Sequence, residues 1–242
     1  GVATLDAGRF ASKQTGSFTT LGTASAYVSI TAALAATTPP ASGDFIVCSE
    51  FYAFDNGGTL IGRSFPLTGA GVTCISADDT AIDSYKKGAS EVTTNSIETT
   101  GKAAYIGFDH ETSNSIEALG NSSVTYKDSI LTLVGSGDYV AAQADGSSVR
   151  LINTEIQAPT NGSVFRVRGG SVVEMLGGTV TSAGTPSFLL EGGSSQVGGC
   201  NLMIVGADLS VIDTTLVNAG AQQGFDDFIN IKIDGCKLNA GV

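Results

Sequence analysis

Residues Val149–Ile156 read VRLINTEI, and this stretch decides the fold because variants of it recur along the chain. Each variant has apolar residues at positions one, three and eight, Asp, Asn or Gly at position five, and a small residue at position six. The starts of successive copies are 25, 24, 36 and 22 residues apart. Repeats of about 20 to 50 residues are typical of solenoids, whose units bury their apolar faces by stacking. The copies are Val124–Leu131, Val149–Ile156, Val173–Val180, Leu209–Leu216 and Ile231–Leu238.

The composition of the 242-residue chain fits one continuous solenoid with a weakly charged surface. The core of a solenoid grows along one axis, so this length does not require two domains. Only 14% of the residues are charged and Gly is abundant at 32, whereas about 25% of residues are charged in typical domains. A surface of small polar residues loses little side-chain entropy on packing, which favours contacts with other chains.

The net charge of −11 argues against two classes of partner. Nucleic acids and anionic membranes attract clustered Lys and Arg, and the chain has only 12 of these residues. No apolar run approaches the roughly 18 residues of a membrane span. The N-terminal sequence GVATLDAGRFASK lacks the basic stretch and apolar block of a signal peptide, so we expect a protein made in a cytoplasm.

The four cysteines, Cys48, Cys74, Cys200 and Cys236, match no zinc-binding spacing. Cys48 and Cys74 are about one coil apart, which predicts neighbouring rungs. Two interpretations stay open: buried thiols that act as small hydrophobic groups, or one disulfide. We expect neither a metal nor a cofactor.

The region before the repeats divides into an arm and a cap. Residues 1–24 are small and polar without periodicity, which predicts an N-terminal arm. Residues 25–42 predict a capping helix and turn, because Tyr27, Ile30 and Leu34 share one face at helical spacing and prolines follow. The helix is expected to cover the apolar end of a β-structure that spans residues 43–242.

This third region is predicted to be all-β. A β-sandwich would not repeat one phrase in one register, and a β-propeller needs blades of about 40 residues. A coil of 22 to 25 residues instead predicts a right-handed parallel β-helix of about eight coils. The polar stretch from Asp78 to Lys102 is predicted to be a non-repetitive excursion. Between the copies, a second strand is expected at Tyr139-Val140, Phe165–Val167, Phe188–Leu190 and Phe228-Ile229.

The entry to the β-region resembles a known superfamily. Ser29–Ala36 (SITAALAA), Pro39-Pro40 and Gly43–Val47 (GDFIV) look like the capping helix, turn and first strand of pectate-lyase-like, single-stranded right-handed β-helices. Leu67–Ile75 (LTGAGVTCI) is similar to their early coils. The superfamily includes polysaccharide lyases and hydrolases, adhesins, and trimeric tailspikes and other virion proteins of bacteriophages.

The catalytic patterns that the resemblance implies are not matched in this sequence. Galacturonase-like hydrolases carry a Gly-His-Gly segment and the lyases an Arg-x-x-Arg pattern, and this chain has neither. Asp78 and Asp79 are the fallback catalytic candidates, because paired carboxylates hydrolyse glycosides, although Asp is also favoured in turns. Asp109-His110-Glu111 offers acid–base groups, but a solvated loop tip is the simpler interpretation. Asp226-Asp227 similarly indicates a loop-to-strand junction rather than a cation site.

Three arginines are candidates for binding. Position two of the repeated phrase points outward, which places Arg150 beside Glu174 on the next coil and predicts a surface ion pair. Arg166 and Arg168 alternate with apolar residues, so both are expected to face solvent, a neighbouring subunit or an acidic glycan.

We therefore expect a non-enzymatic structural protein of a bacteriophage virion, in first place a capsid decoration (cement) protein that stabilises the shell. Its expected partners are itself, as a homotrimer, and the major capsid protein or another virion protein. Neither nucleic acid nor a membrane is expected as a partner. The alternative is a tail fibre or tailspike component that binds or cleaves bacterial surface polysaccharide, and an adhesin is a third interpretation.

Overall fold

The structure is a computed structural model in which the predicted arm (residues 1–24) and capping helix (residues 25–42) lie outside the described residues. Every helix or strand element within the described ranges is a β-strand. The described residues are 45–49, 53–55, 64–65, 72–77, 89–93, 97–99, 102–135, 140–143, 146–158, 163–182, 188–192, 199–212, 215–218 and 229–239.

The strands form three parallel sheets, which we call sheets A, B and C. Sheet A contains β1 (Phe45–Ser49), β4 (Val72–Ala77), β7 (Lys102–Ile106), β10 (Ser123–Lys127), β13 (Ser148–Ile152), β16 (Val172–Leu176), β19 (Cys200–Val205) and β21 (Ile229–Asp234). Sheet B contains β2 (Ala53–Asp55), β5 (Ala89–Thr93), β8 (Phe108–Thr112), β11 (Ile130–Leu133), β14 (Glu155–Ala158) and β17 (Thr179–Ser182). Sheet C contains β3 (Ser64–Phe65), β6 (Ile97–Thr99), β9 (Ile116–Leu119), β12 (Val140–Gln143), β15 (Ser163–Val167), β18 (Phe188–Gly192) and β20 (Thr215–Asn218).

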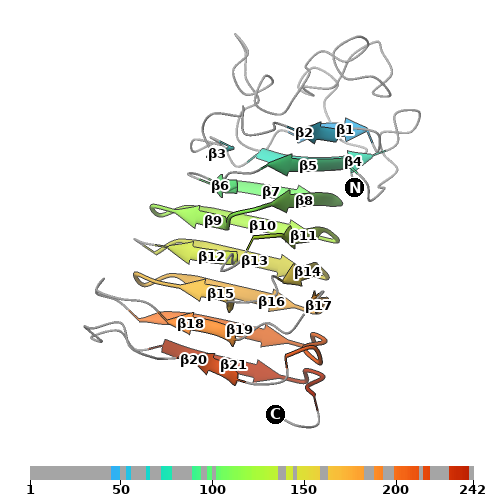
Figure 1. Ribbon diagram of the computed structural model, residues 1–242. Helices are drawn as coiled ribbons and strands as arrows, with labels where there is room; N and C mark the ends of the chain where they lie inside the picture. Colours follow the sequence, from blue (N-terminus) through green and yellow to red (C-terminus); the bar gives the residue numbers. More distant parts are fainter. Residues whose placement is uncertain are drawn as a thin grey trace.

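This topology is a parallel β-solenoid, because from β1 to β18 the chain visits sheets A, B and C in turn, and strands of successive turns pair in parallel. Figure 1 shows the rungs stacked from β1 at one end to β21 at the other. Across residues 102–182, where the description is nearly continuous, the chain makes about three turns. The predicted all-β parallel solenoid is confirmed. The right-handed direction of coiling, the total of about eight coils and the capping helix stay predictions.

The repeated phrase marks sheet A and the corner that leads to sheet B. Val124, Val149 and Val173 are register partners in β10, β13 and β16, as the phrase predicts. The fourth predicted copy, Leu209–Leu216, is wrong. The strand of that rung is β19, in which Leu202 pairs with both Val173 and Ile231.

The correct fourth copy is therefore Leu202–Leu209 (LMIVGADL). With this copy, the last two intervals are 29 residues each, in place of 36 and 22. Leu209 is its eighth position rather than the first position of another copy. The error arose because Leu209–Leu216 has the same apolar alternation, so periodicity alone did not separate the two alternatives.

Two further expectations about strands are wrong. The stretch from Asp78 to Lys102 is not a non-repetitive excursion, because it contains β5 and β6, which pair in register with β8 and β9. Ile229 begins β21 of sheet A and is not part of a second strand between copies. The expected strands at Phe165–Val167 and Phe188–Leu190 are confirmed as parts of β15 and β18 of sheet C. Val140 begins β12 of the same sheet, while Tyr139 lies outside the described residues.

The corner between sheets A and B uses one backbone conformation on successive turns. The residue at position five has a positive φ in each case, with 48° at Asp128, 47° at Asn153 and 67° at Gly177. Asn, Asp and Gly tolerate this left-handed region better than other residues, which explains the composition of the position. The corner residues also bond to one another, since Asn153 Nδ2 donates to Asp128 Oδ1 at 2.7 Å.

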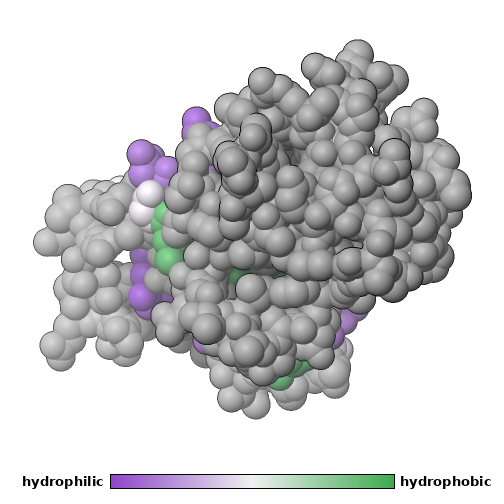
Figure 2. All heavy atoms as spheres, turned by 90° about the horizontal axis from the view of Figure 1, so that it is seen from above, coloured by the Kyte–Doolittle hydropathy of each residue, from purple (hydrophilic) through white to green (hydrophobic). Residues whose placement is uncertain are grey.

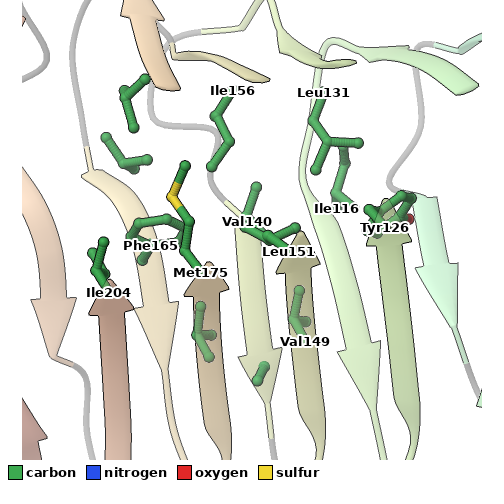
Figure 3. Close-up of a cluster of buried hydrophobic side chains, with 14 of the residues drawn as sticks. Ile116, Tyr126, Leu131, Val140, Val149, Leu151, Ile156, Phe165, Met175 and Ile204 are labelled. Carbon is green, nitrogen blue, oxygen red and sulfur yellow. The ribbon is translucent and has the colours of Figure 1, made fainter. Parts of the chain in front are cut away.

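The interior of the solenoid is a continuous apolar column. Figure 3 shows side chains from the three sheets meeting inside, and all of those that it labels are at most 1% exposed. Fully burying one Leu, Ile or Phe side chain contributes roughly 1.5–3 kcal/mol, so this column is the main source of stability. The labelled residues are Tyr126, Val149, Leu151, Met175 and Ile204 of sheet A, Leu131 and Ile156 of sheet B, and Ile116, Val140 and Phe165 of sheet C.

The four cysteines all lie on or next to strands of sheet A. Cys200 is a buried thiol, and Cys236 is a partly buried one. Cys48 and Cys74 lie on the adjacent strands β1 and β4, as expected of neighbouring rungs. They are two residues out of register, because Cys48 pairs with Ser76 and Cys74 with Ile46.

Candidate interaction surface

The candidate binding arginines lie on two different sheets. Arg150 is on the outer face of β13, and its Nε is 2.6 Å from Oε2 of Glu174 on β16. The predicted ion pair between adjacent coils is therefore confirmed. The Arg150 side chain is 51% exposed, so solvent screens the pair and limits its contribution to roughly 0–1 kcal/mol.

Arg166 lies in β15 of sheet C, and Arg168 directly follows the end of that strand. Both arginines are half-buried. Phe165, before Arg166, and Val167, between the two arginines, are buried, so the predicted alternation is confirmed. In the backbone register, Arg166 lies next to Ala141 on β12 and Glu191 on β18. The three arginines thus do not form one site, because Arg150 lies on sheet A. Asp78 and Asp79 lie outside the described residues.

His110 is not at a solvated loop tip, as the sequence suggested, but inside strand β8. Its side chain is fully buried, and Asp109 and Glu111 on either side are half-buried. Desolvation lowers the pKa of His110 from 6.5 to about 3, so the imidazole is neutral at physiological pH. The Asp-His-Glu triplet therefore does not present three groups on one face for acid–base chemistry.

His110 is held in a box of aromatic rings. Its ring centroid lies 4.8 Å from that of Tyr105, 5.4 Å from that of Phe108 and 5.5 Å from that of Tyr126, in edge-to-face arrangements. Such pairs contribute about 0.5–1.5 kcal/mol each beyond the area that they bury. The histidine therefore occupies a core position, which is filled by Leu131 one turn later.

The outer face of sheet B is a row of hydrogen-bonded polar side chains. Gln157 Nε2 donates to Glu155 Oε1 at 3.0 Å, and its Oε1 accepts from Thr132 Oγ1 at 3.1 Å. Thr181 Oγ1 also donates to Glu155 Oε1, at 3.2 Å. Further along the same column, hydrogen bonds from Ser210 and Lys237 lower the pKa of Asp208 to about 2.

The outer face of sheet A carries an apolar row that the sequence analysis missed. Ile152, Leu176 and Val205 are register partners on β13, β16 and β19, and all three are partly exposed. Val172 and Met203 occupy the other outward columns of the same strands. Ile152, Leu176 and Val205 stand at position four of the repeated phrase. Met203 stands at position two, and Val172 directly precedes the phrase. Reading position four, and not only position two, would have revealed the row.

The apolar row ends in charged residues on both sides. Lys127 of β10 precedes Ile152 in its column, and Asp234 of β21 follows Val205. Flat apolar surface with a charged border is typical of surfaces that pack against another protein. In the view from above, the described residues that reach the surface include both hydrophilic and hydrophobic ones (Figure 2).

Two other kinds of feature are absent from the described residues: a cluster that could hold a metal ion and a helix that could span a membrane. Within those ranges, no group of three or more His, Cys, Asp or Glu residues is placed to hold a metal ion. The described part of the chain also has no helix whose length and hydrophobicity suit a membrane crossing.

Comparisons with family models, curated proteins and solved structures found no match to this chain.

Proposed function

We propose that this chain is a non-enzymatic structural protein of a bacteriophage virion, and that it is a capsid decoration protein. The observation that carries the proposal is the apolar row of Ile152, Leu176 and Val205 on the outer face of the regular parallel sheet A. A rung spacing of about 4.8 Å sets these side chains at fixed positions, so packing against a partner orders few new groups. The resemblance to right-handed, single-stranded β-helices of virions supports the same role.

The proposed assembly is a homotrimer in which the apolar row of each copy faces a common axis. Residues of the same rung meet at such an axis, so Leu176 meets Leu176 and Ile152 meets Ile152. Burying a row of three partly exposed apolar residues per copy is favourable without any strand pairing. The predicted arm, residues 1–24, is then available to contact the shell.

Immunogold electron microscopy tests the location. Antibodies raised against the purified chain are applied to virus particles released from the source culture. Label spread over the capsid is expected, and label confined to the tail would favour the alternative function. Particles that carry no label would contradict a virion role. Removing residues 1–24 should abolish binding of the purified chain to particles, while its far-UV circular dichroism stays unchanged.

A tail component that binds bacterial polysaccharide is the second candidate, and the polar row on sheet B favours it. Glu155, Gln157 and Thr181 form a connected network of carboxylate, amide and hydroxyl groups, which are the groups that bind sugar hydroxyls. Binding to an array of bacterial polysaccharides tests this candidate. It predicts saturable binding that Gln157→Ala weakens and that the outward substitution Thr125→Ala on sheet A leaves unchanged.

A further inference from the structure

Positive and negative residues are segregated between the outer faces of sheets A and B over three consecutive turns. In the turns that contain β7, β10 and β13, the charged residues of sheet A are all basic, and they are Lys102, Lys127 and Arg150. From the corner to the end of the sheet B strand, every Asp, Glu, Lys or Arg residue of these turns is acidic. These residues are Asp109, Glu111, Asp128 and Glu155. All of these basic and acidic residues are at least partly exposed, so the chain has a positive face and a negative face that meet at one corner.

The apolar row lies on the boundary between the two faces. Ile152 and Leu176 are the last residues of β13 and β16, and the corner residues Asn153 and Gly177 follow them directly. One flank of the row is therefore the outer face of sheet A. The other flank is the corner and the outer face of sheet B.

Packing of several copies around the row brings the two flanks together. In a closed ring of identical copies each contact is heterologous, so one flank of a copy meets the opposite flank of its neighbour. The positive face of one copy then lies against the negative face of the next. In parallel copies, residues of the same turn lie at the same height, which sets the basic and acidic residues of one turn opposite each other.

Arg150 and Glu155 are the charged residues that such a contact favours most. The Arg150 side chain is 51% exposed and stands two residues, or about 7 Å, before the row. Glu155 begins β14 on the other side of the corner. Its carboxylate accepts hydrogen bonds from Gln157 and Thr181, and no Lys or Arg in the described part of the chain forms an ion pair with it. A guanidinium group has five N–H donors, so Arg150 can bind a second carboxylate besides that of Glu174.

The same relation holds one turn earlier, closer to the axis. Lys127 is the last residue of β10, at the row position, and Asp128 is the corner residue that follows it. In a ring of parallel copies, Lys127 of each copy therefore lies beside Asp128 of the next. The alternation of the two charges around the axis offsets the repulsion between copies of Lys127.

We propose that neighbouring copies of this chain associate in parallel, with the outer face of sheet A of one copy against the corner and outer face of sheet B of the next. Arg150 of one copy pairs with Glu155 of its neighbour across this contact. The number of copies rests on the trimer of the proposed function, whereas the pairing of unlike faces applies to any closed ring of parallel copies.

Sedimentation equilibrium over a range of concentrations tests the charge pairing. All variants carry Glu174→Gln, so that a reversed residue 150 meets no carboxylate at position 174 of its own chain. Arg150→Glu or Glu155→Arg alone places like charges at every contact, and each should raise the concentration of half-assembly about tenfold. The double variant Arg150→Glu/Glu155→Arg restores unlike charges and should return this concentration to within about threefold of the starting value.

Asn114→Glu is the control variant, because it adds a charge at an exposed position between β8 and β9, at the far end of sheet B from the row. It should leave assembly unchanged, and circular dichroism should show the same fold for every variant. An assembly that neither single reversal weakens, or a double variant as weak as the single ones, would overturn the proposed contact and leave the trimer standing.

Chemical cross-linking tests which faces meet. Arg150→Cys and Glu155→Cys are made as separate variants, and a short bismaleimide is added to each alone and to the two co-expressed together. Linked chains above the level of the parent protein are expected only from the co-expressed pair. Efficient linking of Arg150→Cys to itself would show sheet A facing sheet A and would overturn the proposal.

The mass of the particle separates this inference from the proposed function. A ring of another size that follows the charge reversals would support the contact and contradict the trimer. A parent protein that is a single chain at all concentrations would overturn both, while immunogold labelling would still decide the virion location.

Discussion

At the scale of single residues, Gly178 has the most restrictive environment in the described corners. A Cβ atom at this position would lie 2.2 Å from the carbonyl oxygen of Thr154 and 2.7 Å from its nitrogen. Both are backbone atoms of the neighbouring turn, so they have little freedom to move away. At Gly177, which also has a positive φ, a Cβ atom would meet nothing within 4 Å.

Gly178→Ala should therefore destabilise the fold by roughly 2–4 kcal/mol, and Gly177→Ala by roughly 1–2 kcal/mol. Gly177→Asn should be milder than Gly177→Ala, because Asn153 holds the same corner position one turn earlier. Urea denaturation of the three variants measures the differences. Equal losses for the two alanine variants would mean that the close approach of the backbones is absent.

His110 predicts how stability depends on pH. Its pKa is about 3 in the folded protein and 6.5 in an unfolded chain. Because the folded pKa is the lower one, the unfolded state binds the proton more readily below pH 6.5. The contribution of a neutral His110 to stability is then complete above pH 6.5 and is lost as the pH falls towards 3, by about 1.4 kcal/mol per unit.

His110→Leu should remove this dependence while filling the same core position with an apolar side chain. We expect the free energy of unfolding to fall less steeply in the variant than in the parent between pH 6 and 4. Parallel urea titrations at several pH values give the comparison, in which the carboxylates common to both proteins cancel. Identical slopes would show that His110 is accessible to protons in the folded state.

At the scale of elements, substitutions at two neighbouring positions of β13 test which face of sheet A is inside. Leu151 is fully buried, and its neighbour Ile152 is partly exposed on the outer face. Leu151→Asp places an unpaired carboxylate in the apolar column and should cost about 3–5 kcal/mol, enough to unfold the neighbouring turns. Ile152→Asp should change stability by about 1 kcal/mol or less. Thermal unfolding of both variants measures the difference. A stable and soluble Leu151→Asp protein would contradict the assignment of Leu151 to the inner face of β13.

The sequence predicted the rungs of β10, β13, β16 and β21, in which position five is Asp, Asn or Gly and position eight is aliphatic, but it missed the rung of β19, which has the same features. Val149 and Val173 were placed correctly for this reason. The rung of β7 was not recognised as a copy, because its corner continues into Phe108 and its eighth position is His110. A buried histidine has no sequence signal that separates it from an exposed one, since the aromatic box forms only from rings on neighbouring turns.

The candidate surface was less predictable than the fold for a physical reason. The inward columns follow from the hydrophobic effect acting on each strand alone. Whether Leu176 is covered or exposed depends on what lies outside the sheet, and alternation within one strand does not carry that information. The three arginines likewise needed the topology, because only the assignment of β13 to sheet A and β15 to sheet C separates Arg150 from Arg166.

At the scale of the whole molecule, the apolar row predicts the state of assembly. In solution we expect a particle of three chains of 24.4 kDa each. Leu176→Glu should reduce it to single chains without unfolding them, because the change lies on the outer face. Light scattering coupled to size-exclusion chromatography gives the mass. A parent protein that is already a single chain would contradict the proposed trimer.

The in-register ladder of sheet A has one more consequence. Intervals between copies vary from 24 to 29 residues in the corrected series, yet each rung pairs directly with the next. Excision of residues 149–172 joins Ser148 to Val173 and should leave a folded protein that is shorter by about 4.8 Å, as small-angle scattering would measure. The number of turns alone then sets the distance between the two ends. The length of the solenoid can therefore be changed in steps of one turn, about 4.8 Å each.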